Sequence, residues 1–371
     1  MSDTSKIFEA ARLAFTGALI GDAAAMPVHW YYDVPAIKRD YNGWITQYEK
    51  PHRLHPKSFM KLPEGGENPP LVGHVILHNK LDYWTSSEYL NYHCTMEAGE
   101  NTLNCQCALL IMKSLRQFPS SMNDEEVLKQ IFKEYVEFMT TPDSYTDSYA
   151  ESYHRSFFGD WVKAGKPTEL NALHNFVTKR SETAEKAAYI GALGATTAII
   201  LYFIDRPVDE VISIALKFVK RTHRDETLMK TISNYARILH SVVRGGSLRD
   251  AAEKALIDHF GSGGEEKIRK YDEAVEKADD KLSAYQAIGK ELGIACDVKG
   301  AWPIALLICR NFHDDFEGGI LTNVNIGGDN VGRGSPVGAM LGAAAAWKGK
   351  IPKKWLEGLK YKSQFAEILS K

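Results

Sequence analysis

The chain has 371 residues, of which 44% are hydrophobic and 25% charged, so it can bury one large core or two ordinary ones. A formal net charge of −2 supplies no field that would gather nucleic acid or an anionic membrane, and we expect neither as a partner. The five cysteines include no CxxC pair, which favours reduced thiols in the cytoplasm over a disulfide framework.

The first predicted element is a helix around residues 7–19, where apolar residues recur at helical spacing. Glu9, Arg12 and Asp22 interrupt the apolar character of this segment, so we expect it to be retained rather than cleaved as a signal peptide. Prolines and glycines in residues 50–72 then predict a long irregular connection.

Later segments repeat the helical pattern. Apolar spacing predicts helices around residues 127–139, 211–219 and 228–242, and Ser247 is a suitable cap for one more helix. No convincing strand with period-two alternation is found in the sequence. These features predict an all-α protein, a large single-domain helical bundle of residues 1–371 with long functional loops.

Residues 187–204 are nearly uncharged and almost long enough to span a bilayer. We favour a buried core helix, because the glycines, alanines and threonines of this segment let neighbouring helices approach closely. The other helical segments are amphipathic, and no second candidate span accompanies this one.

Two clusters near the N-terminus could carry chemistry. Asp22 follows an apolar helix and leads through Pro27 to His29, although an aspartate at such a place can simply cap a turn. Glu100, Asn101 and Thr102 precede a second apolar helix, and their oxygens suit a hard cation or a phosphate as well as they suit helix capping.

Two further clusters follow in the second half of the chain. His223 and Asp225 lie in a connector between two amphipathic helices, where a polar surface role is the plain alternative. The segment Gly327–Arg333 combines a glycine pair, Asp329 and an arginine suited to phosphate or carboxylate, directly before a helix of small residues. A glycine turn before a close-packed helix explains the small residues, but it leaves the acid and the arginine without a purpose.

The segment 143–155 alternates tyrosines with charged residues. A spacing of four predicts a helix with Tyr145, Tyr149 and Tyr153 on one face and the charged residues on another. This helix could be solvated, or it could form an aromatic and acidic wall that faces a substrate.

Taken in order, these clusters resemble the ADP-ribosylglycohydrolase family, together with the related J crystallins of jellyfish lens. The resemblance spans nearly the whole chain, and its order and spacing are more specific than any one motif. The matching segments are Gly21-Asp22-Ala23 through Pro27, Thr222-His223-Arg224-Asp225, Gly327-Gly328-Asp329, and Ile351-Pro352 with Trp355.

The chain departs from the family pattern at three places. Active members carry Thr-Asp-Asp-Thr where this chain has Gly99–Thr102, and their closing motif has a second acid where this chain has Val331. A carboxylate common at the end of the opening segment is replaced by His29. The resemblance implies two magnesium ions, but the remaining acids would hold at most one Mg²⁺, bound weakly, or none. In these respects the chain is most similar to the J crystallin branch.

The resemblance also implies roles for individual residues. Catalysis would fall to Glu100, His29 and Asp22, with His29 suited to proton transfer by its ordinary pKa near 6.5. Metal ligands would be Glu100, Asn101, Thr102, Asp329 and Asp225. The substrate would contact Arg333, Gly328, Asn330, His223 and Tyr149. We expect Glu100 and Asp329 to meet across one cleft, with Asp22 or His29 nearby.

Two functions follow from this resemblance. The first is a hydrolase that cleaves an N- or O-glycosidic bond of an ADP-ribose-type compound, so its partner would be a nucleotide-sugar or an ADP-ribosylated substrate. The second is a catalytically inactive, crystallin-like structural or ligand-binding protein of the same fold.

Overall fold

In the computed structural model, residues 3–62, 71–119, 121–184 and 186–361 are described. Every element of regular structure in these ranges is a helix, apart from four isolated β-bridges. This confirms the predicted all-α class. The helices are α1 (Asp3–Ala25), the 3₁₀ helix η1 (Met26–Val28), α2 (Pro35–Asp40), α3 (Leu71–His74), α4 (Leu81–Thr85), α5 (Leu103–Gln117), α6 (Asp124–Thr140), α7 (Ser152–Lys163), α8 (Leu170–Arg180), α9 (Ala192–Tyr202), α10 (Val208–Lys220), α11 (Glu226–Val243), α12 (Leu248–Phe260), α13 (Gly264–Lys277), α14 (Lys281–Leu292), α15 (Val298–Asn311), α16 (Phe316–Ile326), α17 (Asn330–Ala345) and α18 (Lys353–Gly358).

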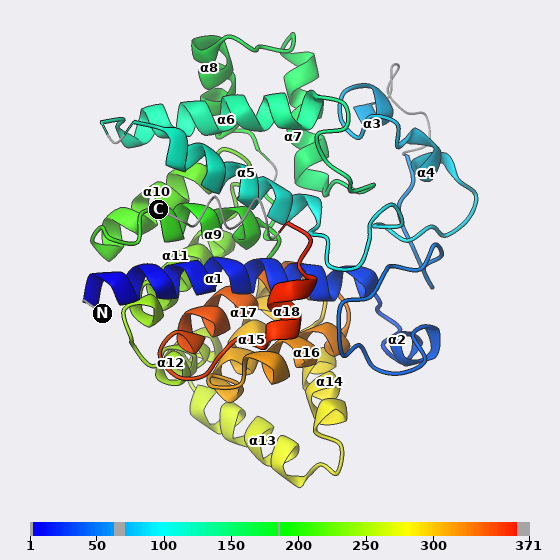
Figure 1. Cartoon of the computed structure of the whole chain (residues 1–371), viewed down its shortest axis with the longest axis vertical. Coiled ribbons are helices and arrows are strands. Elements are labelled where there is room, and N and C mark those ends of the chain that lie inside the picture. The colour runs from blue at the N-terminus through cyan, green and yellow to red at the C-terminus, as the bar shows by residue number, and fades with distance from the viewer. Residues whose placement is uncertain (1–2, 63–70, 120, 185, 362–371) are drawn as a thin grey trace.

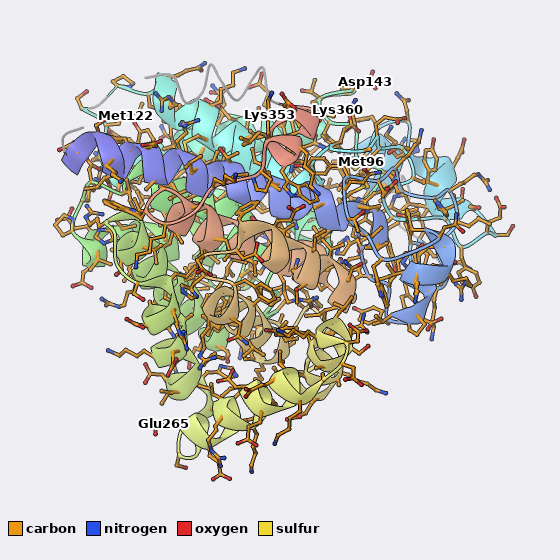
Figure 2. The ribbon with its side chains drawn as sticks, turned by 60° about the horizontal axis from the view of Figure 1, so that its bottom comes forward. Met96, Met122, Asp143, Glu265, Lys353 and Lys360 are labelled. Carbon is orange, nitrogen blue, oxygen red and sulfur yellow. The ribbon has the colours of Figure 1, made fainter. Side chains whose placement is uncertain are left out.

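Helices α1 and α17 form the centre of the bundle. Figure 1 shows α1 crossing the middle of the molecule, with α5 to α8 on one side of it and α12 to α16 on the other. Figure 2 shows the C-terminal segment that carries Lys353 and Lys360 against α1, while Glu265 marks the outer end of α13. Every residue of α17 is buried, which explains why this helix consists mostly of small and apolar residues.

Glycines allow α1 and α17 to touch backbone to backbone. A Cβ atom added to Gly338 would lie 1.9 Å from the carbonyl oxygen of Gly17, and one added to Gly21 would lie 2.0 Å from the carbonyl oxygen of Gly334. No side chain larger than hydrogen fits such contacts without moving a helix. The small residues of 330–345 are therefore a packing requirement.

Helix α9 confirms the prediction of a buried core helix, but it begins later than the apolar run suggested. Its first residue is Ala192, because the backbone of residues 188–190 pairs instead with residues 296–298, through Ile190 N to Cys296 O (2.9 Å) and Val298 N to Ala188 O (2.8 Å). No helix within the described ranges combines the length and the apolar character that a bilayer-spanning segment needs.

The other predicted helices correspond to α1, α6, α10, α11 and α12, and the Ser247 hydroxyl caps α12 by accepting a hydrogen bond from Asp250 N. The predicted helix over residues 143–155 is wrong for most of its length, because α7 begins only at Ser152. The Asp147 carboxylate accepts hydrogen bonds from the backbone of Leu103 and Tyr149, and these contacts hold the preceding segment in an irregular path.

Candidate functional site

Asp22, near the end of α1, anchors the start of α5. Its carboxylate accepts hydrogen bonds from the backbone N–H and hydroxyl of Thr102 (2.8 and 2.6 Å) and from the side-chain amide of Asn101 (2.8 Å). Burial raises the pKa of Asp22 to about 6, although these hydrogen bonds oppose the shift. Thr102 occupies the N-cap position of α5, but its hydroxyl serves Asp22 rather than the helix.

Four buried side chains form a continuous chain of hydrogen bonds beside this anchor. Asp147 Oδ1 lies 2.8 Å from His93 Nδ1, His93 Nε2 lies 2.8 Å from His29 Nδ1, and His29 Nε2 lies 3.1 Å from Asp329 Oδ1. Each of the four residues is only 1% exposed. Two imidazoles therefore bridge two carboxylates that are 182 residues apart in sequence (329 minus 147).

The positions of the hydrogens along this Asp147–His93–His29–Asp329 series of hydrogen bonds follow from its geometry. Asp147 acts as an acceptor throughout, since it also accepts from Leu103 N and Tyr149 N, so His93 donates through Nδ1. His93 then accepts at Nε2, and His29 donates to it through Nδ1. Two neutral imidazoles supply two hydrogens, and both are used in the first two contacts. The third contact, between His29 Nε2 and Asp329 Oδ1, therefore needs one more hydrogen. Because burial lowers the pKa of His29 while Asp329 raises it, we place this hydrogen between His29 Nε2 and Asp329.

The glycine turn before α17 fixes the position of Asp329. Gly327 and Gly328 have positive φ angles of 74° and 62°, and a Cβ atom on Gly328 would lie 2.1 Å from the carbonyl oxygen of Ile294. Gly328 also pairs with the segment after His29, through Trp30 N to Gly328 O (2.8 Å). The glycines bring backbone close to backbone, rather than to a ligand as the sequence suggested.

Arg333 does not have the free guanidinium that a phosphate clamp requires. It is fully buried, and its three nitrogens donate to Asn323 Oδ1 (3.2 Å), Ile294 O (3.2 Å) and Gly327 O (2.5 Å). Burial lowers its pKa to about 10, opposed by the nearby Asp329. Arg333 therefore holds the glycine turn in shape, and its predicted role in binding the substrate stays a prediction.

Glu151 brings a fourth carboxyl group to the site, after Asp22, Asp147 and Asp329. It precedes α7, and its Oε1 accepts a hydrogen bond of 2.5 Å from the side-chain amide of Asn104. Burial, followed by the charge of Asp329, raises the pKa of Glu151 to about 8. A cavity of about 10 Å³, roughly the space of one water molecule, lies between this carboxyl and the four-membered chain. Its lining comprises His29, His93, Thr102, Leu103, Asn104, Asp147, Tyr149 and Glu151.

Aromatic rings cover this cavity. The Trp30 ring stacks on His29 at a centroid distance of 4.1 Å, and Tyr149 meets Trp30 edge to face at 5.2 Å. Trp84 lies parallel to Tyr149 at 5.4 Å. Trp30 has a positive φ angle of 62°, which is strained for a bulky side chain and is held by its backbone bond to Gly328.

The structure gathers only part of the predicted site. Asp22, His29, Asn101, Thr102, Asp329 and Tyr149 belong to the cluster. Asn330 lies beside it, but its amide nitrogen donates to the carbonyl oxygens of Val28 and Val324. Gly328 belongs to the turn.

Three predicted residues have other partners. Glu100 accepts a hydrogen bond from Glu97 N, Asp225 caps α11 by accepting from Thr227 N and Leu228 N, and His223 lines a separate cavity. Sequence reasoning did not select His93 or Asn104 as site residues, and it considered Asp147 and Glu151 only as part of an acidic wall. No motif marks them, since they lie in irregular segments or on one face of an apolar helix.

The donors present do not fit a pair of cations. Within the described ranges, no group of three or more His, Cys, Asp or Glu side chains is arranged so that it could hold a metal ion. The oxygens of Asp22 accept three protein hydrogen bonds, and Asp329 Oδ1 accepts two. Asn101 Oδ1 and Asn330 Oδ1 are buried without partners, but two neutral oxygens do not neutralise a dication. The ionisable groups gathered here are the acids and the two imidazoles.

Comparison with known proteins agrees with this architecture. A sequence profile of the family described as ADP-ribosylglycohydrolase matches residues 3–371. The chain belongs to the ADP-ribosylglycohydrolase family. Crystallin J1A of Tripedalia cystophora is 23% identical over 374 residues, which cover 100% of this chain and 98% of the crystallin.

Among solved structures, an "ADP-ribosylglycohydrolase-related protein complex" aligns with a TM-score of 0.53 at 16% identity, covering 98% of this chain and 97% of the other. At this identity the likeness shows a shared fold. Within the ADP-ribosylglycohydrolase family, members typically bind divalent metals. In this chain a histidine pair lies between two of the acids.

Proposed function

We propose that this ADP-ribosylglycohydrolase-family protein is a hydrolase that cleaves an N- or O-glycosidic bond of an ADP-ribose-type compound without a metal ion. The observation that carries the proposal is the raised pKa of Glu151, about 8, at a cavity that is also lined by His29, the hydrogen-bond partner of Asp329. Glycoside hydrolysis commonly uses one protonated carboxyl group as an acid and one ionised carboxylate as a base or nucleophile. Glu151 has the environment of the acid, and we assign the second role to Asp329.

In the proposed hydrolysis, Glu151 and Asp329 carry out the two proton transfers. Protonated Glu151 donates its proton to the leaving nitrogen or oxygen while the bond from the anomeric carbon to that atom breaks. A water molecule adds its oxygen to the anomeric carbon, and one of its protons passes to Asp329, whose shared hydrogen stays on His29 Nε2. The His29–His93–Asp147 chain fixes the orientation of Asp329 and holds the shared hydrogen beside it. A substrate reaches these groups only after the cover of Trp30 and Tyr149 moves, because the cavity holds about one water molecule.

The proposal is tested by measuring release of ADP-ribose from ADP-ribosylated peptides in the presence of EDTA. We expect turnover that survives chelation, and a loss of about 100-fold or more in kcat for Glu151→Gln, which keeps the shape but not the acid. Glu97→Gln, an exposed residue paired with Lys50, is the matched control. Activity that requires added Mg²⁺, or full activity in Glu151→Gln, would refute the assignment.

The second function is that of a crystallin-like structural or ligand-binding protein without catalysis. It is favoured by the small size of the cavity and by the complete pairing of Asp22 and Asp147 with protein donors. Calorimetric titration with ADP-ribose, with and without Mg²⁺, separates the possibilities. Binding without turnover would support a ligand-binding protein, and no binding at all would support a structural one.

A further inference from the structure

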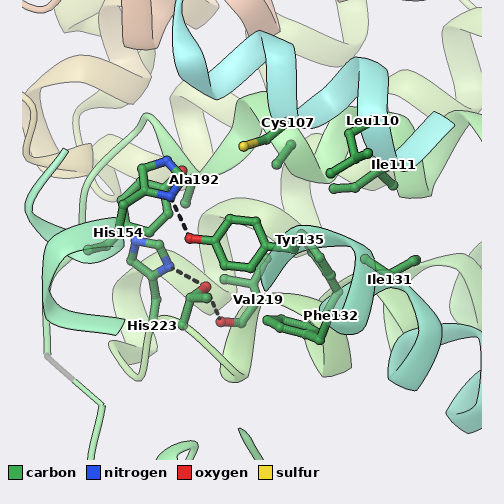
Figure 3. Close-up of a pocket in the computed structure, with 14 residues that line it drawn as sticks. Cys107, Leu110, Ile111, Ile131, Phe132, Tyr135, His154, Ala192, Val219 and His223 are labelled. Atoms are coloured by element: carbon green, nitrogen blue, oxygen red, sulfur yellow. Dashed lines mark hydrogen bonds between the residues drawn. The ribbon is translucent and has the colours of Figure 1, made fainter. Parts of the chain in front are cut away.

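A second row of hydrogen bonds leads from α6 through α7 and α5 to Glu151, apart from the series that ends at Asp329. Figure 3 shows its far end, where Tyr135 Oη lies 2.6 Å from His154 Nδ1. His154 Nε2 lies 3.3 Å from Asn104 Oδ1, and the amide nitrogen of Asn104 lies 2.5 Å from Glu151 Oε1. Tyr135, His154 and Asn104 are 8%, 1% and 7% exposed, so bulk water does not compete for these contacts.

The Asn104 carbonyl oxygen sets the direction of this row, because it can only accept hydrogen bonds. One donor to it is the Tyr153 hydroxyl, at 3.0 Å. Burial lowers the pKa of His154 to about 3, so its imidazole is neutral and carries a single N–H. His154 therefore donates through Nε2 to Asn104 and accepts the Tyr135 hydrogen at Nδ1. With its oxygen occupied in this way, Asn104 presents its N–H to Glu151.

The carboxyl group of Glu151 is confined between α5 and the start of α9. A Cβ atom on Gly191, the N-cap residue of α9, would lie 2.7 Å from Oε1 and 2.8 Å from Oε2. Within the described ranges, Oε1 accepts the hydrogen bond from Asn104, whereas Oε2 has no hydrogen-bond partner. In a protonated carboxyl group the oxygen without the hydrogen is the better acceptor. An N–H donor at Oε1 therefore favours the acidic hydrogen on Oε2.

We propose that Asn104 is a positioning residue that directs the acidic hydrogen of Glu151 to Oε2, and that His154 and Tyr153 hold Asn104 in this orientation. The role rests on the proposed function, in which Glu151 donates its hydrogen to the leaving atom. The oxygen that is free of protein donors is then the one that carries the hydrogen. The same N–H stabilises the carboxylate left after the transfer, since it opposes the effect of burial on the pKa of Glu151.

The test follows the Glu151 carboxyl carbon by ¹³C NMR during a pH titration of the full chain, with the spectrum of Glu151→Gln to assign the signal. Asn104→Leu should raise the pKa of Glu151 by about 1, because the carboxylate loses its N–H donor. His154→Phe should raise it by less, since Tyr153 still binds the Asn104 oxygen. The other charged groups that act on this carboxyl are unchanged in both variants; they are Asp329, Arg155 and Asp22.

The control is Thr197→Val, which removes a buried hydroxyl paired with Tyr235 and should leave the pKa of Glu151 unchanged. A lower pKa of Glu151 in Asn104→Leu would overturn the proposal, because the amide oxygen rather than the N–H would then face the acid. An unchanged pKa, or an equal rise in the control, would overturn it as well. If Asn104→Leu does not fold, an unchanged pKa in His154→Phe is the refuting result.

Turnover separates this proposal from the hydrolase assignment. Asn104→Leu should lower kcat about 10-fold with little change in KM, and it should move the alkaline limb of the pH profile upward, following the pKa of Glu151. Full turnover in Glu151→Gln would refute the hydrolase assignment, whereas the carboxyl titration would still report whether Asn104 donates to Glu151.

Discussion

Replacing Gly338 by alanine should strongly destabilise the protein. A Cβ atom there would lie 1.9 Å from the carbonyl oxygen of Gly17 and 2.6 Å from its carbonyl carbon. Real Cβ atoms do not approach backbone closer than about 3 Å, so α1 and α17 would have to separate by roughly 1 Å. A gap of that size forfeits a quarter to a half of the dispersion energy along the contact, and overpacking typically costs about 1–3 kcal/mol. Because both partners are backbone, we expect about 3 kcal/mol.

The matched control is Gly159→Ala in α7. Gly159 is also inside a helix, but no atom outside that helix's local backbone lies within 4 Å of a Cβ placed there. Alanine should therefore stabilise the protein by about 0.5–1 kcal/mol through helix propensity. The free energy of unfolding of both variants is measured by urea denaturation. Equal stability of Gly338→Ala and Gly159→Ala would show that the helices are not in backbone contact.

Further predictions concern buried polar groups. The pKa of His223 is about 3 in the folded protein and 6.5 in the unfolded chain, so below pH 6.5 only the unfolded chain binds a proton there and the wild type loses stability. The free energy of unfolding of His223→Asn relative to wild type should therefore rise by about 2 kcal/mol between pH 7.5 and pH 5, measured by urea denaturation. Glu151 has a raised pKa, so Glu151→Gln should gain stability relative to wild type as the pH rises from 4.5 to 8, and a constant difference would contradict the shift. Asp22→Asn should cost about 1–3 kcal/mol, seen as a lower urea midpoint, because Thr102 donors lose their acceptor. Arg333→Lys should cost about 3 kcal/mol, since one ammonium cannot reach three acceptors, and a midpoint equal to that of wild type would show that the guanidinium is dispensable.

The helices were largely predictable from the sequence because amphipathic spacing records which face is buried. In α10 and α11, the apolar residues at helical spacing are the ones that are buried. The start of α9 was not predictable, because the pairing of Ile190 with Cys296 involves backbone atoms, and backbone pairing leaves no trace in an apolar run. The irregular path through Asp147 was missed for a similar reason, since tyrosines at a spacing of four imitate a helical face.

Site residues that belong to a sequence motif could be predicted, and those outside any motif could not. Asp22, His29 and Asp329 lie beside glycines or prolines, which mark unusual backbone geometry in the sequence. The structure places His29 within 3.1 Å of Asp329, as the motifs led us to expect. His93 became visible only through its two hydrogen bonds, one to each neighbour in the buried chain. The contacts of Arg333 were not predictable, because a sequence shows that a guanidinium is present but not which carbonyl groups surround it.

The pairing of α1 with α17 has a consequence for synthesis on the ribosome. Asn330, the first residue of α17, follows Ala25, the last residue of α1, by 305 residues (330 minus 25). At about 5–20 residues per second, α1 leaves the ribosome about 15–60 s before its partner helix is made. During that time the face of α1 that carries Gly17 and Gly21 lacks the α17 backbone against which it packs. The centre of the bundle is therefore completed last, and a nascent chain halted before residue 330 should remain a client of chaperones.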